Sequence, residues 1–425
     1  MKIVVIGGGI SGCAAYLQLK KHLPQPSPSS QHEIIIFEAY DTDVNTTHDD
    51  RDGQTHSSTL VVGGGLGLLP NGLRVLKRLD EDILRDVVRG GYVIAHQNMK
   101  SKNGTLLLRM DPTADPDLEP DGKRMHLLGT SRHSLWSNLR RRIPDCDIRT
   151  KRVSRVVADD RGRNMVYFAD GNPPVEADLV IGADGVKGVT KHALFPEQQI
   201  CGPEYQGLVG VGGFISTEEV QGLVEKGSMN LVFGGNGFFG YFFSDCTSSA
   251  LDSGSAYHVS EPGEALAWWS TYTADECPDP KTLDMGAVAR QLCERHAHWK
   301  DPVIQKILPS LRVRSMFPTW TSPQLPTWQR DGVVLVGDAA HALPSTSGQG
   351  SSQALEDAEA FAMLLSHTLA ITTAARQYEG IRYPHVQAIL ENAQRMQNSK
   401  RDMGLIAEYI MMFPEHDVAF PEEGD

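Results

Sequence analysis

The stretch KIVVIGGGISG, residues 2–12, decides the fold of this 425-residue chain. Its apolar IVVI run is typical of a buried parallel strand. Gly7, Gly9 and Gly12 then match the fingerprint of a dinucleotide-binding turn, because they allow a tight turn, close backbone approach to a pyrophosphate and close packing of helix on strand. Ser11 lies at the start of the following helix, whose free N–H groups and positive dipole end favour phosphate.

A carboxylate follows the second predicted strand. Residues 33–37 form another apolar run and end in Glu38, which suits the hydroxyls of a ribose. Glu38 lies further on than the usual ~20 residues, and the polar stretch 24–31 accounts for the excess as a surface loop. Because a strand precedes the glycines and a helix and an acid follow them, we expect a nucleotide site rather than a glycine-rich turn without a ligand.

Two later strands also lead into short acidic turns. Residues 178–181 precede the turn GADG, residues 182–185, and residues 333–336 precede Gly337-Asp338. Either turn alone would be unremarkable, since Asp and Gly are common turn residues. The second turn is followed by small residues and then by a predicted amphipathic helix over 354–365, and these small residues are Gly348, Gly350, Ser351 and Ser352.

In this order and separation, the three segments resemble the motifs of the class A FAD-dependent monooxygenases, which include aromatic hydroxylases, salicylate-hydroxylase-like proteins and fungal biosynthetic enzymes. The resemblance covers roughly residues 1–80 and 125–385. It implies an α/β fold, with a Rossmann-like FAD-binding domain of the glutathione-reductase type (GxGxxG), a mixed β-sheet substrate domain and C-terminal helices. It also implies bound FAD, with NAD(P)H and O₂ as co-substrates.

The resemblance assigns cofactor contacts residue by residue. Asp184 and Gly185 would lie near the pyrophosphate and the path of the nicotinamide, and Asp338 would bind the ribityl or diphosphate groups. The segment from Gly348 through Gly350 and Ser351 to Ser352 would direct helix N–H groups at the pyrimidine edge of the flavin. A helix N-terminus there would stabilise the negative charge of the reduced flavin.

Two further segments strengthen the resemblance. The glycine-rich stretch 63–72 would run beside the flavin ring, with Gly65 allowing the backbone to approach it. The stretch 131–135 would bring Arg132 to the cofactor; its alternative is a surface cation. Gly188 and Lys191 stand where the family usually has Ser and Arg.

The domains implied are discontinuous. Residues 1–80, 125–200 and 321–375 would form the FAD-binding domain, and residues 81–124 and 201–320 the substrate domain. A C-terminal helical region over 376–425 would complete the chain.

The substrate side is predicted from a hairpin. Residues 229–233 and 238–244 flank an Asn-Gly pair at 236–237, which is typical of a hairpin turn. Because the resemblance implies that one sheet face covers the flavin, we expect Asn230, Phe239 and Tyr241 to contact substrate, with Tyr241 a candidate acid or base. The alternative is that these aromatic side chains are core. No other catalytic residue is predicted.

Charge patterning bears on the substrate. No Arg occurs between residues 191 and 290, and Lys occurs there only at 191, 226 and 281. A pocket built from this region lacks the guanidinium fork that holds a carboxylate. We therefore expect a neutral, largely apolar aromatic or polycyclic substrate. Arg51 or Arg74 would be the exception, supplied from elsewhere.

Bulk composition excludes several functions. The net charge of −13 disfavours a nucleic-acid partner. The six cysteines form no CxxC pair and no zinc-like cluster, so we expect no metal and a reduced, cytoplasmic protein. No run approaches the 18 or so apolar residues of a membrane span. The oligomeric state stays open.

The leading hypothesis is thus an FAD-dependent monooxygenase of secondary metabolism that inserts one oxygen atom by hydroxylation or epoxidation, with Baeyer–Villiger insertion also compatible. A flavin-dependent halogenase or reductase is one alternative, although the Trp-x-Trp-x-Ile-Pro segment of such halogenases does not occur. A non-catalytic binding protein on a flavin fold is another, of a different class.

Overall fold

The computed structural model describes residues 1–25, 31–40, 65–111, 122–197, 202–234, 237–247, 254–279, 282–313, 316–344 and 347–412. Asn236 and the whole stretch 41–64, which includes Arg51, lie outside these described residues, as do residues 413–425.

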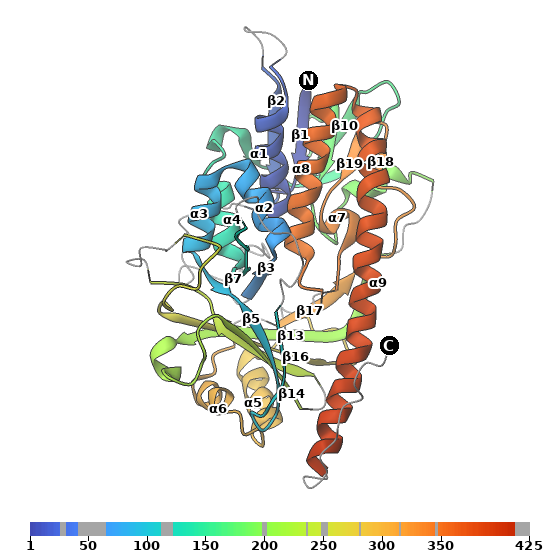
Figure 1. The fold of residues 1–425 in the computed structure, drawn as a ribbon. Helices are drawn as coiled ribbons and strands as arrows, with labels where there is room; N and C mark the ends of the chain where they lie inside the picture. Colours follow the sequence, from blue (N-terminus) through green and yellow to red (C-terminus); the bar gives the residue numbers. More distant parts are fainter. Residues whose placement is uncertain are drawn as a thin grey trace, which may run out of the picture.

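A six-stranded sheet organises the upper half of the molecule in Figure 1, in the order β18-β19-β12-β1-β2-β8. Neighbouring strands are parallel except at the β18 edge, and Val5 at the centre pairs with Ile36 and Ile181. Its central strands are buried on both faces, which explains their unbroken apolar runs. The strands are β1 (Lys2–Ile6), β2 (Glu33–Glu38), β8 (Ile148–Thr150), β12 (Leu179–Gly182), β18 (Gln329–Arg330) and β19 (Val333–Leu335).

Helices and two small sheets surround this sheet. Side-chain caps set two helix starts: Asp80 accepts a hydrogen bond from the N–H of Asp82, and Ser131 from that of Ser134. The helices are α1 (Ile10–His22), α2 (Pro70–Leu79), α3 (Glu81–Arg89), α4 (Arg132–Arg140), α7 (Asp338–His341), α8 (Gly350–Thr368) and α9 (Ile371–Met412), with 3-10 turns η1 (Asp145–Asp147) and η2 (Thr190–Leu194). The small sheets are β3 (Gly65–Leu68), β7 (Leu127–Ser131) and β4 (Gly91–Ile94), and β11 (Val175–Ala177), β10 (Asn164–Phe168) and β9 (Val153–Val157).

A mixed seven-stranded sheet forms the lower half, in the order β17-β13-β16-β15-β14-β5-β6. Figure 1 shows it between the upper half and the helices α5 and α6. The hairpin expected from the sequence is present as β14 and β15, whose residues Asn230 and Tyr241 are paired. The elements are β5 (His96–Ser101), β6 (Leu106–Met110), β13 (Glu204–Ser216), β14 (Ser228–Phe233), β15 (Phe238–Phe243), β16 (Ala265–Thr273), β17 (Met316–Thr321), α5 (Met285–His296), α6 (Pro302–Ile307), η3 (Thr217–Val220) and η4 (Leu308–Ser310).

The structure places one predicted segment differently. Residues 81–124 were expected in the substrate domain, but α3 and β4 join the upper half, where Ile83, Val87 and Val93 enter the same core as β1. The reason is that α3 packs on α4 and β4 pairs with β7. The seven-stranded sheet begins only with β5.

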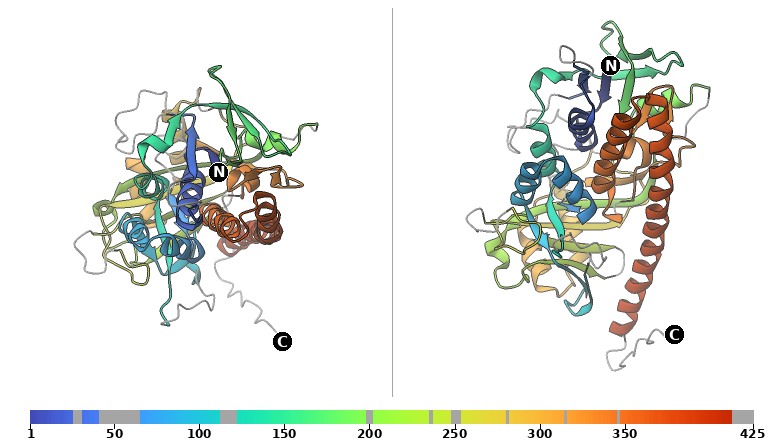
Figure 2. Two further views of the ribbon diagram at one scale, coloured as in Figure 1. Left: turned by 90° about the horizontal axis from the view of Figure 1, so that it is seen from above. Right: turned by 45° about the horizontal axis from the view of Figure 1, so that its top comes forward.

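Two long helices close one side of the upper half. Helix α8 packs on α1, and α9 packs on α8 and continues beside the seven-stranded sheet in both side views (Figures 1 and 2). The helical region predicted over 376–425 thus begins earlier, at Ile371. No helix among the described residues is long and apolar enough to cross a membrane.

Candidate functional site

Three turns that are far apart in the sequence meet at the carboxyl ends of β1, β12 and β19. Gly7 has φ +102°, and a Cβ there would lie 2.4 Å from the carbonyl oxygen of Ala183. Gly337 has φ +59°, and a Cβ there would lie 2.3 Å from Oγ of Ser11. Both positions need glycine, since a side chain would be strained and would collide with the neighbouring turn. The carboxyl ends of adjacent parallel strands are where open α/β sheets bind ligands.

The first turn is held on both sides. A Cβ on Gly12 would lie 1.9 Å from the carbonyl oxygen of Gly7, so this glycine lets α1 pack directly on the turn. The indole Nε1 of Trp136 donates to the carbonyl oxygen of Gly8 at 2.8 Å, and the N–H of Gly8 donates to the Glu38 carboxylate at 2.6 Å. Glu38 therefore lies beside the glycine turn and orients it, and its contact with a ribose stays a prediction. Gly9 is the N-cap of α1.

Asp184 turns inward. Its Oδ2 accepts hydrogen bonds from the N–H and the Oγ1 of Thr190, both at 2.9 Å, so it holds the first residue of η2. Burial raises the pKa of this carboxyl, and its hydrogen bonds oppose that shift. A Cβ on residue 188 would lie 2.2 Å from Oδ1 of Asp184, which explains the glycine found where the family usually has Ser. Lys191 is buried too, and its Nζ donates to the carbonyl oxygen of Val186 at 2.8 Å.

The turn around Asp338 faces outward instead. Asp338 is exposed at the start of α7. Gly348, at φ +64°, precedes α8, and Gly350 is its first residue. A Cβ on either would meet no neighbouring described atom within 4 Å, so there is open space in front of this helix N-terminus. Ser351 is half-buried there. Ser352 differs from the expectation: it is fully buried, and its Oγ accepts from the N–H of Leu69 at 3.2 Å, linking α8 to the β3–α2 junction.

Gly65 and Arg132 lie close together at the junction of the two halves. Gly65 pairs with Ser131, the residue before Arg132, in the β3–β7 ladder. Arg132 is exposed at the first position of α4. A Cβ on Gly65 would lie 2.9 Å from Cζ of Phe242, so the lower sheet approaches this backbone closely. Gly185, at φ +74°, has open space around it.

The chain matches the family of FAD binding domains over residues 1–393. It belongs to that family. Curated relatives include the 3-amino-4-hydroxybenzoate 2-monooxygenase of Streptomyces cremeus, which is 26% identical over 79% of this chain and 78% of the relative. Another is the chloroplastic zeaxanthin epoxidase of Nicotiana plumbaginifolia, 23% identical over 92% of this chain, which spans about half (53%) of that relative. The solved structure of Klebsiella pneumoniae HpxO complexed with FAD and uric acid has a TM-score of 0.74 at 21% identity, covering 98% of this chain and 93% of that chain.

These findings confirm the resemblance, the fold class and FAD as the cofactor, and the protein is an FAD-dependent monooxygenase. The described residues fit FAD: glycines at the strand ends leave no room for side chains, whereas space remains before α8. When bound, FAD supplies the redox chemistry. The described residues contain no cluster of three or more His, Cys, Asp or Glu that could hold a metal.

The predicted substrate contacts lie on the far side of the seven-stranded sheet. Phe239 contacts His296 of α5 edge-on, with ring centroids 5.2 Å apart. The hydroxyl of Tyr241 accepts from Nζ of Lys100 at 2.9 Å and donates to Oδ2 of Asp301, the N-cap of α6, at 3.2 Å. Both residues therefore face α5 and α6, away from the FAD half. Alternation along β15 does not tell which of its two faces is turned toward FAD, and the expectation that Phe239 and Tyr241 lie on that face was wrong.

Asn230 shares this face, because it is paired with Tyr241. Its amide accepts from Asn98 at 3.2 Å and donates to Ser228 at 2.9 Å. Burial, followed by the charge of Asp301 and the hydrogen bond to it, raises the pKa of Tyr241 far above its usual range. A tyrosine that keeps its proton and is bonded inside the sheet–helix interface does not act as a base.

The opposite face of the sheet is turned toward the FAD half. A Cβ on Gly129 of β7 would lie 2.5 Å from Cδ2 of Phe242, which places this ring against the upper half. Residues two apart share a face of a strand. Phe238, Gly240 and Phe242 on β15 therefore share this face. Leu231 on β14 and Trp269 on β16 share it too, because both are paired with Gly240. The sequence pattern marked these residues only as apolar.

Proposed function

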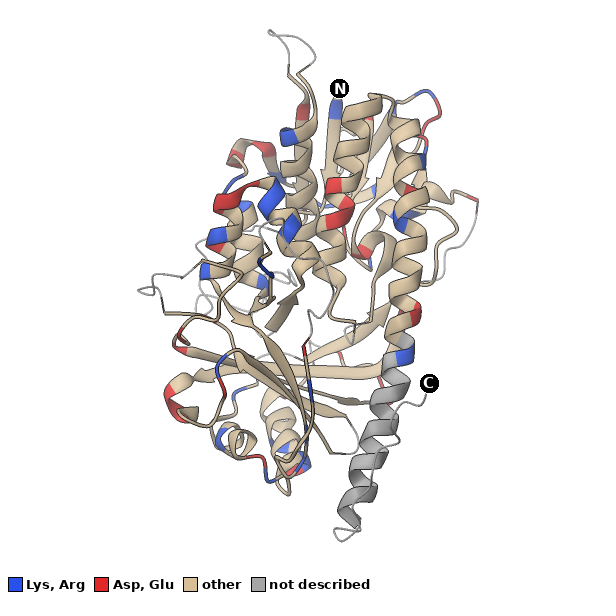
Figure 3. Ribbon diagram, viewed as in Figure 1, with Lys and Arg blue, Asp and Glu red and all other residues tan. Residues whose placement is uncertain are grey.

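We propose that this FAD-dependent monooxygenase uses NAD(P)H and O₂ to insert one oxygen atom, by hydroxylation or epoxidation, into a neutral, largely apolar aromatic or polycyclic substrate of secondary metabolism. One observation carries the substrate class. Strands β14, β15 and β16 contain no Lys, Arg, Asp or Glu and are tan throughout in Figure 3. On the face toward the FAD half, Leu231, Phe238 and Trp269 offer contact area and no charge.

The polar groups of this sheet support the same proposal. Lys100 is the cation nearest to Tyr241, and it is bound on the other face, between that tyrosine and Asp301. A carboxylate substrate would need a cation on the FAD side, because a buried unpaired charge costs several kcal/mol (about 3–5). Of the two possible sources considered from the sequence, Arg74 lies in α2 of the FAD half and not in this sheet, and Arg51 lies outside the described residues, so the comparison of neutral compounds with carboxylates tests both.

The relatives are consistent with both kinds of oxygen insertion. One is named for monooxygenation of an aminohydroxybenzoate and another for epoxidation of zeaxanthin. A set of glycines, acids and small polar residues at these turns holds and orients FAD. These are Gly7, Gly9, Ser11, Gly12, Glu38, Gly65, Arg132, Asp184, Gly185, Asp338, Gly348, Gly350 and Ser351. The apolar face closes the reacting region from water.

The test follows NAD(P)H oxidation together with O₂ uptake and hydrogen peroxide release. Neutral aromatic and polycyclic compounds are compared with the carboxylates of the same rings, with and without halide. We expect a neutral compound to stimulate turnover, with little release of hydrogen peroxide and no halogenated product. Stimulation restricted to the carboxylates would overturn the substrate class, and a halide-dependent product would overturn the reaction.

A variant sharpens this test. Leu231→Arg places a guanidinium on the face toward FAD, and we expect the ratio of kcat/KM for neutral over carboxylate compounds to fall by about tenfold or more. Leu223→Arg, at an exposed position in the same half, is the matched control and leaves the ratio unchanged. An unchanged ratio in Leu231→Arg would mean that this face does not contact the substrate.

A further inference from the structure

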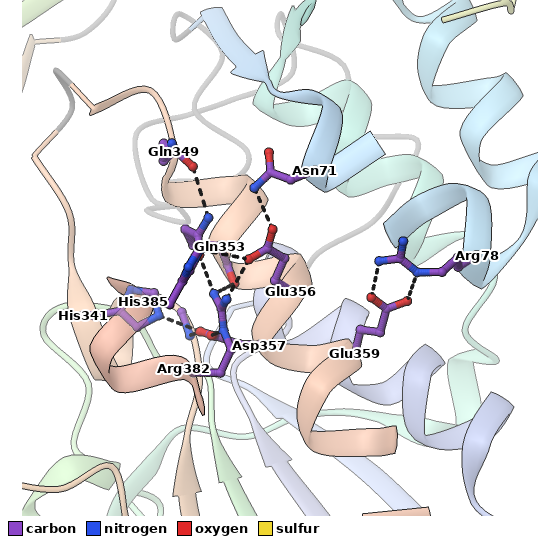
Figure 4. Close-up of polar contacts among 11 residues, drawn as sticks. Asn71, Arg78, His341, Gln349, Gln353, Glu356, Asp357, Glu359, Arg382 and His385 are labelled. Atoms are coloured by element: carbon purple, nitrogen blue, oxygen red, sulfur yellow. Dashed lines mark hydrogen bonds and ion pairs between the residues drawn. The ribbon is translucent and has the colours of Figure 1, made fainter. Parts of the chain in front are cut away.

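One arginine of the C-terminal helix reaches two separate parts of the FAD site. Arg382 on α9 is buried, with its side chain only 6% exposed. Its Nε donates to Oδ1 of Asp357 at 2.8 Å, and its Nη1 donates to Glu356 at 2.7 Å. Asp357 is fully buried on α8. Figure 4 shows these side chains converging between the two helices.

The first branch leads to the turn that precedes Asp338. Oδ2 of Asp357 accepts from the backbone N–H of Gly337 at 2.9 Å and contacts Nε2 of His341 at 2.6 Å. Burial alone would raise the pKa of Asp357, but the charges of His341 and Arg382 outweigh it and hold the pKa well below its usual range. The carboxylate therefore stays ionised and binds both ends of α7.

The second branch leads to the N-terminus of α8. Nη2 of Arg382 donates to the side-chain oxygen of Gln353, and also to its carbonyl oxygen at 3.3 Å. The amide of Gln353 in turn donates to Oε1 of Gln349 at 3.1 Å. Gln349 is the N-cap of α8 and sits between Gly348 and Gly350. The same guanidinium thus fixes the helix end that opens toward the FAD site.

We propose that Arg382 is a positioning residue for FAD, which holds the Gly337–Asp338 turn and the N-terminus of α8 in their binding arrangement before the cofactor arrives. The inference rests on the assignment of these two elements to FAD. A planar guanidinium can serve both branches at once, because its N–H groups form a rigid fork, whereas a lysine offers one point charge. Preorganisation of this kind removes part of the cost of ordering a site on binding.

The first experiment measures the FAD dissociation constant of the apoprotein by flavin fluorescence. In Arg382→Met, which keeps the length of the side chain but removes the fork, we expect the dissociation constant to rise by about tenfold or more. The dissociation constant of Arg382→Lys should lie between those of Arg382→Met and the wild type. Gln353→Met cuts only the second branch and should raise the constant by about threefold.

Arg78→Met is the matched control. Arg78 of α2 also binds a carboxylate of α8 through two hydrogen bonds, to Glu359 (Figure 4). Among the described residues, neither bond involves the Gly337 turn or the N-terminus of α8. We expect its FAD dissociation constant to stay within about twofold of the wild type. Equal constants for Arg382→Met, Arg78→Met and the wild type, all folded by circular dichroism, would overturn the proposal while leaving the monooxygenase assignment intact.

A second readout separates positioning from stability. Displacing the α8 N-terminus should weaken binding of reduced, anionic FAD more than binding of oxidised FAD. A further tenfold loss for the reduced form would lower the two-electron midpoint potential by about 30 mV. If Arg382→Met does not fold, Arg382→Lys and Gln353→Met carry the test. Weaker FAD binding in either, with no change in Arg78→Met, supports the proposal, and unchanged binding in both overturns it.

Discussion

The two large sheets of this protein use their polar residues in opposite ways. In the six-stranded sheet, polar groups lie at the strand ends, where Asp338 is exposed and open space lies before α8. In the seven-stranded sheet, Tyr241, Lys100 and Asp301 lie within the interface with α6 and bond to one another. The first arrangement leaves hydrogen-bonding capacity for a ligand, whereas the second uses it to join sheet to helix.

This difference shows how to interpret a polar residue that is buried in the substrate half. Buried polar groups must be hydrogen-bonded, and a strand that packs against a helix supplies the partners internally. Ser270 and His296 repeat the pattern, with Oγ and Nε2 3.0 Å apart on the α5 side. The face toward FAD is built from the remaining positions of the same strands, which are uncharged and mostly apolar, with Thr271 of β16 beside Phe238 as a hydroxyl-bearing exception.

Asp338→Ala should have the largest effect, because it removes a carboxylate from an open site. Loss of hydrogen bonds involving a charged group costs about 3 kcal/mol, or roughly 100-fold in FAD affinity. The ratio of flavin to protein absorbance after gel filtration measures the loss. Asp160→Ala, which removes an exposed acid outside the site, is the control. A variant that keeps stoichiometric FAD would show that Asp338 does not bind the cofactor.

The contrast also explains what the sequence could predict. Gly7, Gly12 and Gly337 occupy positions where a Cβ would collide with a neighbouring turn. Because only glycine fits there, the sequence itself reveals these positions. Fold class, family and cofactor followed from such positions. The Asp357 cluster was missed, although an acid on a helix face otherwise made of Ala354, Leu355 and Ala358 was a signal. Its partner Arg382 lies 25 residues further on, a separation that no local pattern connects.

The second prediction concerns the pH dependence of stability in the seven-stranded sheet. Burial, helped by Arg295 and His298, lowers the pKa of His296 from 6.5 to about 4. The unfolded chain binds the proton below about pH 6.5 and the folded protein only below about pH 4, so stability is complete above 6.5 and is lost as pH falls toward 4. Between about pH 7.5 and 5 this amounts to about 2 kcal/mol.

Urea unfolding at a series of pH values measures this dependence. His296→Gln cannot titrate, so its stability should change less over this range than that of the wild type. His192→Gln, which alters an exposed histidine of η2 outside this sheet, should behave as the wild type. Identical pH profiles for wild type and His296→Gln would show that His296 is not held neutral in the folded sheet.

The substrate side could not be predicted to the same depth. Period-two alternation placed Phe239 and Tyr241 on one face of β15, as found. Which face meets FAD depends on contacts outside the hairpin: Phe242 against Gly65 and Gly129 on one side, and α5 and α6 on the other. The sequence does not show which residues hydrogen-bond to Tyr241, and without them the hydroxyl could be interpreted as a catalytic acid or base. Here Asp301 caps α6 and binds the tyrosine as well.

Tyr241→Phe should therefore have the smallest effect. The change removes two hydrogen bonds but leaves Lys100 and Asp301 3.8 Å apart as a direct ion pair, so we expect a loss of about 1 kcal/mol in stability. Because the hydroxyl points away from FAD, kcat/KM and the ratio of product to NAD(P)H consumed should stay within about twofold of the wild type. Tyr92→Phe, which deletes another buried hydroxyl bonded to a backbone N–H, is the control. A drop of about tenfold or more in kcat for Tyr241→Phe alone, with FAD fully bound, would mean that the polar face of the sheet takes part in the reaction. The polar face would then not serve only to join the sheet to α5 and α6.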